Sequence, residues 1–296
     1  MCGIIGYTGN KSAAPILLEG LSRLEYRGYD SAGIAVLGAN GDPSVHKSQG
    51  KLSALLELFR DGLPEGTCGI GHTRWATHGS PTDLNAHPHT DCRNEIAVVH
   101  NGIVENFLDL RKTLVEQGHR FTSQTDSECI AHLIESYLVD DRPLEDAVKL
   151  AASRLRGAHA VVATSFREPG TLVAFRLGNA GGIVVGYGES EMLLASDIPA
   201  VLPYTSTVAY LGDGEVVSTD ASGARYSHMD GTSLEKDVSQ VDYDADRAGK
   251  GDYRHFMLKE IHEQPEVVVN ALRGRVSFET SEIEMEGFAL SHKEIQ

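Results

Sequence analysis

The hydrophobic pattern changes at about residue 157, and this change limits the fold more than any other feature of the sequence. Before this point, stretches with a helical period alternate with short apolar stretches. After it, apolar residues recur with a period of two in short segments separated by Gly, Pro and Asp turns. These segments are 158–166, 171–177, 182–187, 191–195, 207–211 and 215–219. Because the chain lacks a βαβ rhythm, the pattern predicts a layered α+β fold.

The first half of the chain is predicted to contain several helices and a few strands. One helix is expected to open at a capping box, Thr125-Asp126-Ser127-Glu128. The other predicted helices span 12–26, 53–60, 104–117 and 143–156, and the predicted strands span 32–37, 68–76 and 95–100.

A polar, glycine-containing run marks a domain boundary. We predict a first domain at 1–241, a linker at 242–254 and the truncated start of a further domain at 255–296. Within this last part, 253–271 is expected to be helical with an interruption at Pro265.

The composition excludes several classes of function. With 26 basic and 42 acidic side chains, the formal net charge is −16, which disfavours non-specific binding to nucleic acid or to an anionic membrane. No apolar run approaches the ~18 residues of a membrane span. The four cysteines form no CxxC pair and are expected to be reduced. We therefore expect a cytoplasmic protein that binds neither nucleic acid nor membranes.

Cys2 is the first candidate for chemistry. If Met1 is removed, one residue carries both a thiol nucleophile and an α-amine, which titrates near ~8. The alternative is a small residue near a frayed chain end. The strand-like run Gly3–Tyr7 favours a buried, positioned terminus instead.

The segment from His72 to Gly79 is the second candidate. Arg74 offers a bidentate fork for a carboxylate, although an internal buried ion pair is an equal alternative. Thr77 and His78 add hydrogen-bonding groups. Trp75, the single tryptophan, belongs either to the core or to a movable lid.

Two further positions each allow two interpretations. Asn101-Gly102 is a common hairpin-turn dipeptide, and it also places an amide and a backbone N–H side by side for an oxyanion. Asp126 is favoured near a helix N-terminus by the helix dipole, and it can equally face a ligand's ammonium group.

A histidine-rich stretch raises the question of a metal. Its members are His72, His78, His87, His89 and Cys92, whose spacing matches none of the usual zinc patterns. Phosphate-loop, GxSxG and strand-linked GxGxxG motifs are also missing. We therefore expect no metal and no cofactor.

Several of these pieces together resemble the glutaminase domain of the glucosamine-6-phosphate synthase family, a class II amidotransferase. The shared motifs are Met1–Ile4, Glu25–Gly33, His72–Gly79, Asn85–His89, His100–Asn106, Thr125–Glu128 and Tyr253–Pro265. The resemblance implies an α+β N-terminal-nucleophile hydrolase fold, a four-layer αββα sandwich of two antiparallel sheets between helical layers. The last motif resembles the entry into the family's sugar isomerase domain.

The resemblance also implies a catalytic centre. Cys2 would attack the side-chain amide of L-glutamine, and Asn101 and the N–H of Gly102 would form the oxyanion hole. A γ-glutamyl thioester would then release ammonia and glutamate.

The same resemblance implies the substrate contacts. Arg74 would hold the α-carboxylate of glutamine, and Asp126 its α-ammonium group. Thr77 and His78 would line the same loop, and Trp75 would gate an ammonia channel.

For the whole enzyme, the family implies transfer of this ammonia to fructose 6-phosphate, giving glucosamine 6-phosphate for hexosamine and cell-wall precursor synthesis. Fructose 6-phosphate would bind only through the missing isomerase domain, and the full-length enzyme would be a homodimer. No cofactor is implied.

Three alternatives stay open at this point. The glutaminase could feed another acceptor, such as phosphoribosyl pyrophosphate. The domain could bind an amino acid without turnover, and a retained Met1 would favour that interpretation. The histidine-rich stretch could instead belong to a structural metal-binding protein.

Overall fold

The structure is a computed structural model that describes residues 2–38, 43–241, 252–254, 256–273, 275–277 and 282–283. The chain divides into two compact units, 1–245 and 246–296.

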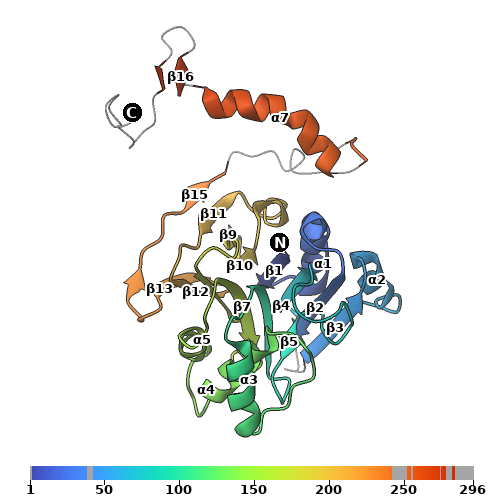
Figure 1. Cartoon of the computed structure of the whole chain (residues 1–296), viewed down its shortest axis with the longest axis vertical. Helices are drawn as coiled ribbons and strands as arrows, with labels where there is room; N and C mark the ends of the chain where they lie inside the picture. The colour runs from blue at the N-terminus through green and yellow to red at the C-terminus, as the bar shows by residue number, and fades with distance from the viewer. Residues whose placement is uncertain are drawn as a thin grey trace. The chain divides into compact units, whose positions relative to one another are not determined.

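Two antiparallel sheets packed face to face form the centre of the first unit (Figure 1). In the described residues, one sheet has the strand order β15-β11-β9-β10-β1-β4-β2-β3, and the other β14-β13-β12-β8-β7-β6-β5. The strands of the first sheet are β1 (Gly3–Thr8), β2 (Ser31–Leu37), β3 (Pro43–Gln49), β4 (Cys68–Arg74), β9 (Val184–Gly188), β10 (Glu191–Ala195), β11 (Thr207–Tyr210) and β15 (Ser239–Gln240). Those of the second are β5 (His89–Thr90), β6 (Ile96–Gly102), β7 (His159–Ser165), β8 (Leu172–Leu177), β12 (Glu215–Asp220), β13 (Gly223–His228) and β14 (Ser233–Leu234).

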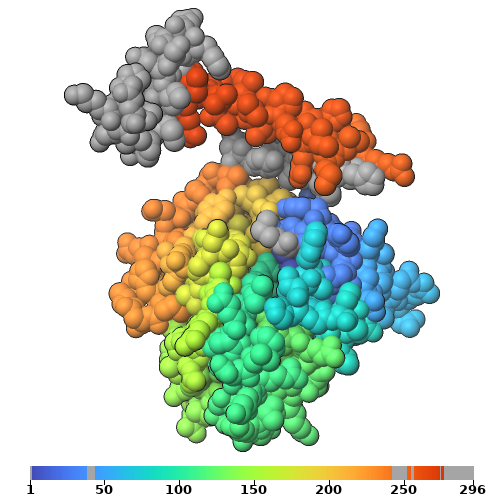
Figure 2. Space-filling model, in the orientation of Figure 1, coloured from blue at the N-terminus to red at the C-terminus, as the bar shows by residue number. Residues whose placement is uncertain are grey.

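Helices cover the outer face of each sheet. The first sheet is covered by α1 (Ala13–Leu24) and α2 (Leu52–Glu57). The second is covered by α3 (Phe107–Glu116), α4 (Glu128–Tyr137) and α5 (Leu144–Ala152), which gather at one end of the unit in the space-filling view (Figure 2). A short 3₁₀ turn follows α1 at Glu25–Arg27, and another follows β10 at Ile198–Ala200. The predicted α+β sandwich with the layer order helix, sheet, sheet, helix is confirmed.

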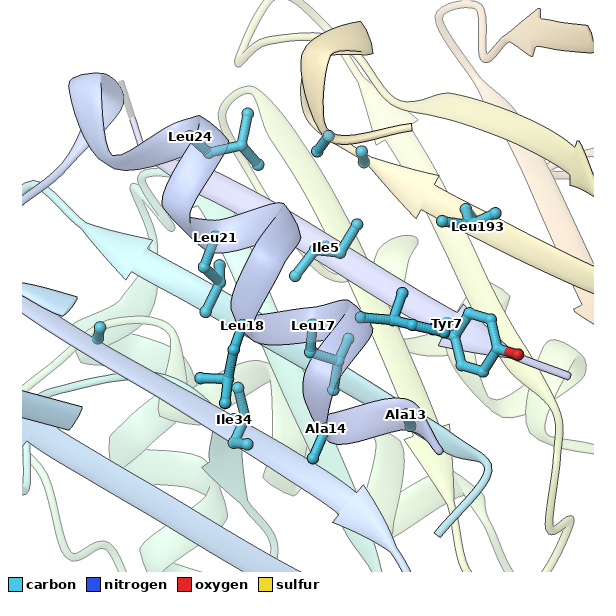
Figure 3. Close-up of a cluster of buried hydrophobic side chains, with 14 of the residues drawn as sticks. Ile5, Tyr7, Ala13, Ala14, Leu17, Leu18, Leu21, Leu24, Ile34 and Leu193 are labelled. Carbon is cyan, nitrogen blue, oxygen red and sulfur yellow. The ribbon is translucent and has the colours of Figure 1, made fainter. Parts of the chain in front are cut away.

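Strand β1 is buried on both faces, and this explains its continuous apolar sequence. Ile5 and Tyr7 pack under α1 against Leu17 (Figure 3). Ile4, which points to the opposite face of the pleat, packs between the two sheets. A helix on one side and a sheet on the other therefore favour apolar residues at successive positions.

Strand register brings the predicted site residues to one edge of the sandwich. Gly3 pairs with Thr73 across the antiparallel strands β1 and β4. Consequently Cys2 lies beside Arg74, the last residue of β4. The end of β6, in the second sheet, contributes Asn101 and Gly102.

The structure excludes one of the two interpretations of Asn101-Gly102 and contradicts the prediction of a capping box. Asn101-Gly102 forms no hairpin turn, because both residues belong to β6 and pair with β7. The capping box at Thr125–Glu128 does not form either: α4 begins at Glu128, and this carboxylate accepts hydrogen bonds from Thr122 and Ser123 instead. Asp126 therefore precedes the helix rather than opening it.

The second unit contains α7 (Phe256–Leu272), β16 (Val276–Ser277) and β17 (Glu282–Ile283). The predicted helix is present, but it continues through Pro265 without a break. Most of the predicted linker and much of 255–296 lie outside the described residues. Among the helices that the structure describes, none has the length and apolarity required to cross a membrane.

Candidate active site

A cavity of about 490 Å³ opens at the edge where the three strand ends meet. Its volume falls in the usual range of small-molecule sites, ~300–1,000 Å³. The predicted residues that line it are Cys2, Arg74, Trp75, Thr77, Asn101, Gly102 and Asp126.

Cys2 is held in place by contacts to its backbone and to its thiol. Its carbonyl oxygen accepts hydrogen bonds from Asn101 Nδ2 at 3.0 Å and from Arg27 Nε at 3.2 Å. Its Sγ accepts the N–H of Trp75 at 3.2 Å. Burial raises the pKa of the thiol, while this hydrogen bond from Trp75 lowers it; the net shift is upward. The thiol is therefore protonated at neutral pH, and a base is needed to activate it.

His72, which the sequence analysis did not assign to the site, orients Asn101. His72 Nε2 lies 3.1 Å from Asn101 Oδ1 and 3.2 Å from the carbonyl oxygen of His100. Because both neighbours are acceptors, Nε2 carries the proton. This contact fixes the amide so that its NH₂ group faces Cys2.

Arg74 is buried, and its guanidinium is anchored by the loop that follows β4. It donates hydrogen bonds to the carbonyl oxygens of His78 and Gly79, the latter at 3.2 Å. His78 thus supports the arginine through its backbone. Its ring packs against Phe107 and is not among the groups that line the cavity in the described structure.

Trp75 and Thr77 are exposed beside this arginine. The Trp75 side chain is 50% exposed and packs edge to face on Tyr29, with ring centroids 5.6 Å apart. It therefore lies at the mouth of the cavity and outside the core.

Asp126 provides a buried carboxylate to the wall of the cavity. Its Oδ2 accepts the N–H of Val104 at 2.7 Å. Its Oδ1 has no hydrogen-bond partner within the described part of the chain, and the residue lines the cavity. The cavity therefore combines a cation, an anion, a thiol and an amide.

Sequence reasoning missed part of the cavity wall. Asn179, Ala180 and Gly181, in the loop between β8 and β9, line it. Their glycine-rich surroundings were interpreted only as a turn between strands. At Gly102 the backbone requires glycine, because φ is +135° and an added Cβ would lie 2.2 Å from the carbonyl oxygen of Ala158.

Four buried histidines around this site make stability depend on pH. Burial lowers the pKa of His72 to about 4, and it lowers those of His87, His89 and His100 well below their usual value. Below pH ~6.5 these histidines bind protons in the unfolded chain but stay neutral in the folded chain. The free energy of unfolding therefore decreases as the pH falls.

We expect the free energy of unfolding to decrease between pH 6.5 and 5 by up to about 1.4 kcal/mol per pH unit for each such histidine. Urea unfolding at several pH values measures this slope. The variant His72→Gln should show a shallower decrease. A flat profile would contradict the buried, neutral state of these rings.

Comparisons with known proteins bear on the family and the fold. Residues 72–203 match the family model described as glutamine amidotransferase domain. The described fold is similar to a solved glutamine phosphoribosylpyrophosphate amidotransferase from B. subtilis, with a TM-score of 0.64 and 28% identity over 77% of this chain and 49% of that chain. The chain therefore contains a class II glutamine amidotransferase domain.

Over its own length, this chain is also similar to glutamine–fructose-6-phosphate aminotransferases. It is 45% identical over 296 residues to the glutamine–fructose-6-phosphate aminotransferase (isomerizing) of Caldanaerobacter subterraneus, covering 100% of this chain and 48% of the relative. The protein of the same name from Methanothermobacter thermautotrophicus is 52% identical over 92% of this chain and 45% of the relative. The chain is thus a homologue of these aminotransferases and spans about half of their length.

Proposed function

We propose that this chain hydrolyses L-glutamine to glutamate and ammonia through a thioester on Cys2. The observation that supports this most is the single cavity that joins the Cys2 thiol to the Asn101 amide, with Arg74 and Asp126 on its walls.

The proposed nucleophile needs a base, because burial keeps its thiol protonated. Removal of Met1 would free the α-amine of Cys2, which titrates near ~8 and accepts the thiol proton, directly or through a water. The sulfur then attacks the side-chain amide carbon. The tetrahedral intermediate expels ammonia as the amine returns the proton to the leaving nitrogen. Water hydrolyses the resulting thioester and releases glutamate.

The remaining groups bind the amino acid and the developing charge. Asn101 Nδ2 and the N–H of Gly102 would donate to the oxyanion. Arg74 would bind the α-carboxylate and Asp126 the α-ammonium group. We assign Trp75, at the mouth of the cavity, as the gate through which ammonia leaves. Thr77 lies beside it in the same loop.

The variant Asp126→Asn tests the ammonium contact. The side-chain oxygen of the introduced asparagine can still accept the N–H of Val104, so the fold is retained while the negative charge is lost. A hydrogen bond to a charged group contributes about 1.5–3 kcal/mol, so we expect KM for glutamine to rise about 10- to 100-fold.

Steady-state kinetics measures this rise in KM. Asp213→Asn is the matched control, since Asp213 also accepts a backbone N–H, that of Gly178, and is not among the residues that line the cavity. An unchanged KM in Asp126→Asn would exclude the proposed contact.

For the whole protein, we propose that the ammonia converts fructose 6-phosphate to glucosamine 6-phosphate. This rests on identities of 45–52% to aminotransferases of that name, against 28% to the phosphoribosylpyrophosphate enzyme. Residues 1–241 would be the amidotransferase domain, 242–254 the linker, and 255–296 the start of a sugar isomerase domain. Homodimerisation and a cytoplasmic location remain predictions.

Intact-mass measurement before and after exposure to a glutamine-like diazoketone tests the catalytic proposal. We expect loss of Met1 and one adduct that maps to Cys2. A retained Met1 without an adduct would favour a domain that binds an amino acid without turnover.

A further inference from the structure

A second cluster of chemically reactive side chains lies outside the cavity. It consists of Cys92, His119, His132 and Glu135, whose potential ligand atoms all lie within 4.8 Å of one another. We call it the Cys92 cluster. Its members come from three segments: the loop after β5, the turn after α3, and one face of α4. The helices α3 and α4 lie side by side (Figure 1).

The distances in the Cys92 cluster are close to those of a tetrahedral metal site. Cys92 Sγ lies 3.8 Å from His119 Nδ1 and 3.7 Å from His132 Nδ1. Glu135 Oε2 lies 2.7 Å and 3.1 Å from the same two nitrogen atoms. Zinc bonds of about 2.0–2.3 Å place tetrahedral ligand atoms roughly 3.3–3.6 Å apart, a value that these contacts bracket.

We propose that the Cys92 cluster binds one zinc ion in a closed, four-coordinate site. A thiolate, two imidazoles and a carboxylate are the ligands that zinc takes in proteins, whereas calcium and magnesium take oxygen ligands. With four protein ligands no position remains open for a substrate, so the ion would be structural. The sequence analysis expected no metal because the spacing of the histidine-rich stretch matches no usual zinc pattern, and it did not consider His119, His132 and Glu135, which lie beyond that stretch.

Two contacts around the cluster fit coordination by a sulfur and an oriented imidazole. The backbone N–H of Arg120 donates to Cys92 Sγ at 3.2 Å, a contact that a metal-bound thiolate can keep. His132 Nε2 is buried without a hydrogen bond in the described structure, yet it points to Glu128 Oε1 at 3.6 Å. Metal-bound histidines commonly direct their second nitrogen at such a carboxylate.

The same carboxylate connects the cluster to the cavity wall. Glu128 accepts hydrogen bonds from the N–H groups of Thr122 and Ser123, which precede Asp126 in one loop. A bound zinc would therefore fasten three chain segments and hold the base of this loop. This role requires no assumption about glutamine hydrolysis.

Metal analysis of the untagged, reduced chain tests the proposal. After incubation with zinc and removal of the excess, we expect one equivalent of zinc per chain, and the same in Cys2→Ala, which removes the partly exposed thiol of the cavity. At a free zinc concentration of about a thousand times the Kd, the Tm should be about 10 °C higher than without zinc. Replacement by Co²⁺ should give a sulfur-to-cobalt charge-transfer band and the intense visible bands of tetrahedral cobalt.

Variants assign the ligands. We expect Cys92→Ser and His119→Ala to lose the bound equivalent and the zinc-dependent rise in Tm, whereas Cys129→Ala and His228→Ala, outside the cluster, keep both. The cobalt spectrum of the unmodified chain does not depend on how these variants fold. A spectrum without the sulfur band, zinc well below one equivalent, or equal zinc in Cys92→Ser would overturn the site. The four groups would then be a hydrogen-bonded network around Glu135.

Discussion

The variant Cys2→Ala is expected to abolish glutamine hydrolysis, with kcat lowered at least about 10⁴-fold. Alanine removes the sulfur that forms the proposed thioester, and no other thiol lines the cavity in the described structure. Binding is expected to persist, because Arg74 and Asp126 remain. Ammonia release measures the first effect, and calorimetric titration with glutamine measures the second.

Cys129→Ala is the matched control for this experiment. Cys129 is fully buried in α4, and burial raises the pKa of its thiol to about 12, so it is no nucleophile at neutral pH. We expect its kcat to stay close to that of the unmodified chain. If Cys2→Ala retained hydrolysis, the thioester mechanism would be excluded.

The fold was predictable where burial dictates the hydrophobic pattern. Segments such as 158–166 and 171–177 match β7 and β8 closely, because their successive residues face either a helical layer or the other sheet. Strand β3 was missed since its sequence, PSVHKSQ, is polar and lies at the edge of its sheet. Its pairing with β2 comes from tertiary context, which a local pattern does not contain.

The site was predictable where a family motif named its residues, and less so where geometry alone brings them together. Cys2, Arg74, Asn101 and Asp126 line one cavity as expected. The roles assigned to them remain predictions. His72 belonged to the quoted motif, but its contact with Asn101 depends on the approach of two sheets.

The Cys92 cluster depends even more strongly on tertiary packing, which local sequence does not show. Its first and last members are separated by 43 positions in the sequence. Spacing rules for zinc apply to ligands on one turn or hairpin, and here only His132 and Glu135 share an element. The loop after β5 and the turn after α3 both pack against α4 and complete the cluster, and local sequence cannot reveal this packing.

Asn101→Ala is expected to lower kcat about 10²- to 10³-fold with little change in KM. The proposed hydrogen bond from Nδ2 forms only when the amide oxygen of glutamine becomes negative, so its loss affects the transition state and not binding. Asn101→Asp is the sharper variant. It keeps the shape of the side chain and an acceptor for His72 Nε2, but it replaces the donor by a negative charge facing the oxyanion.

Steady-state kinetics of both variants separates this role from a structural one. If Asn101 acts only by holding the Cys2 carbonyl, KM and Tm should change together with kcat. Asn106→Ala is the control, because its amide also bridges two backbone groups, those of Arg154 and Arg156, and is not among the groups that line the cavity. A kcat within about ten-fold of the unmodified chain in Asn101→Asp would exclude Asn101 from the oxyanion hole, because one such donor contributes about 2.7–4 kcal/mol.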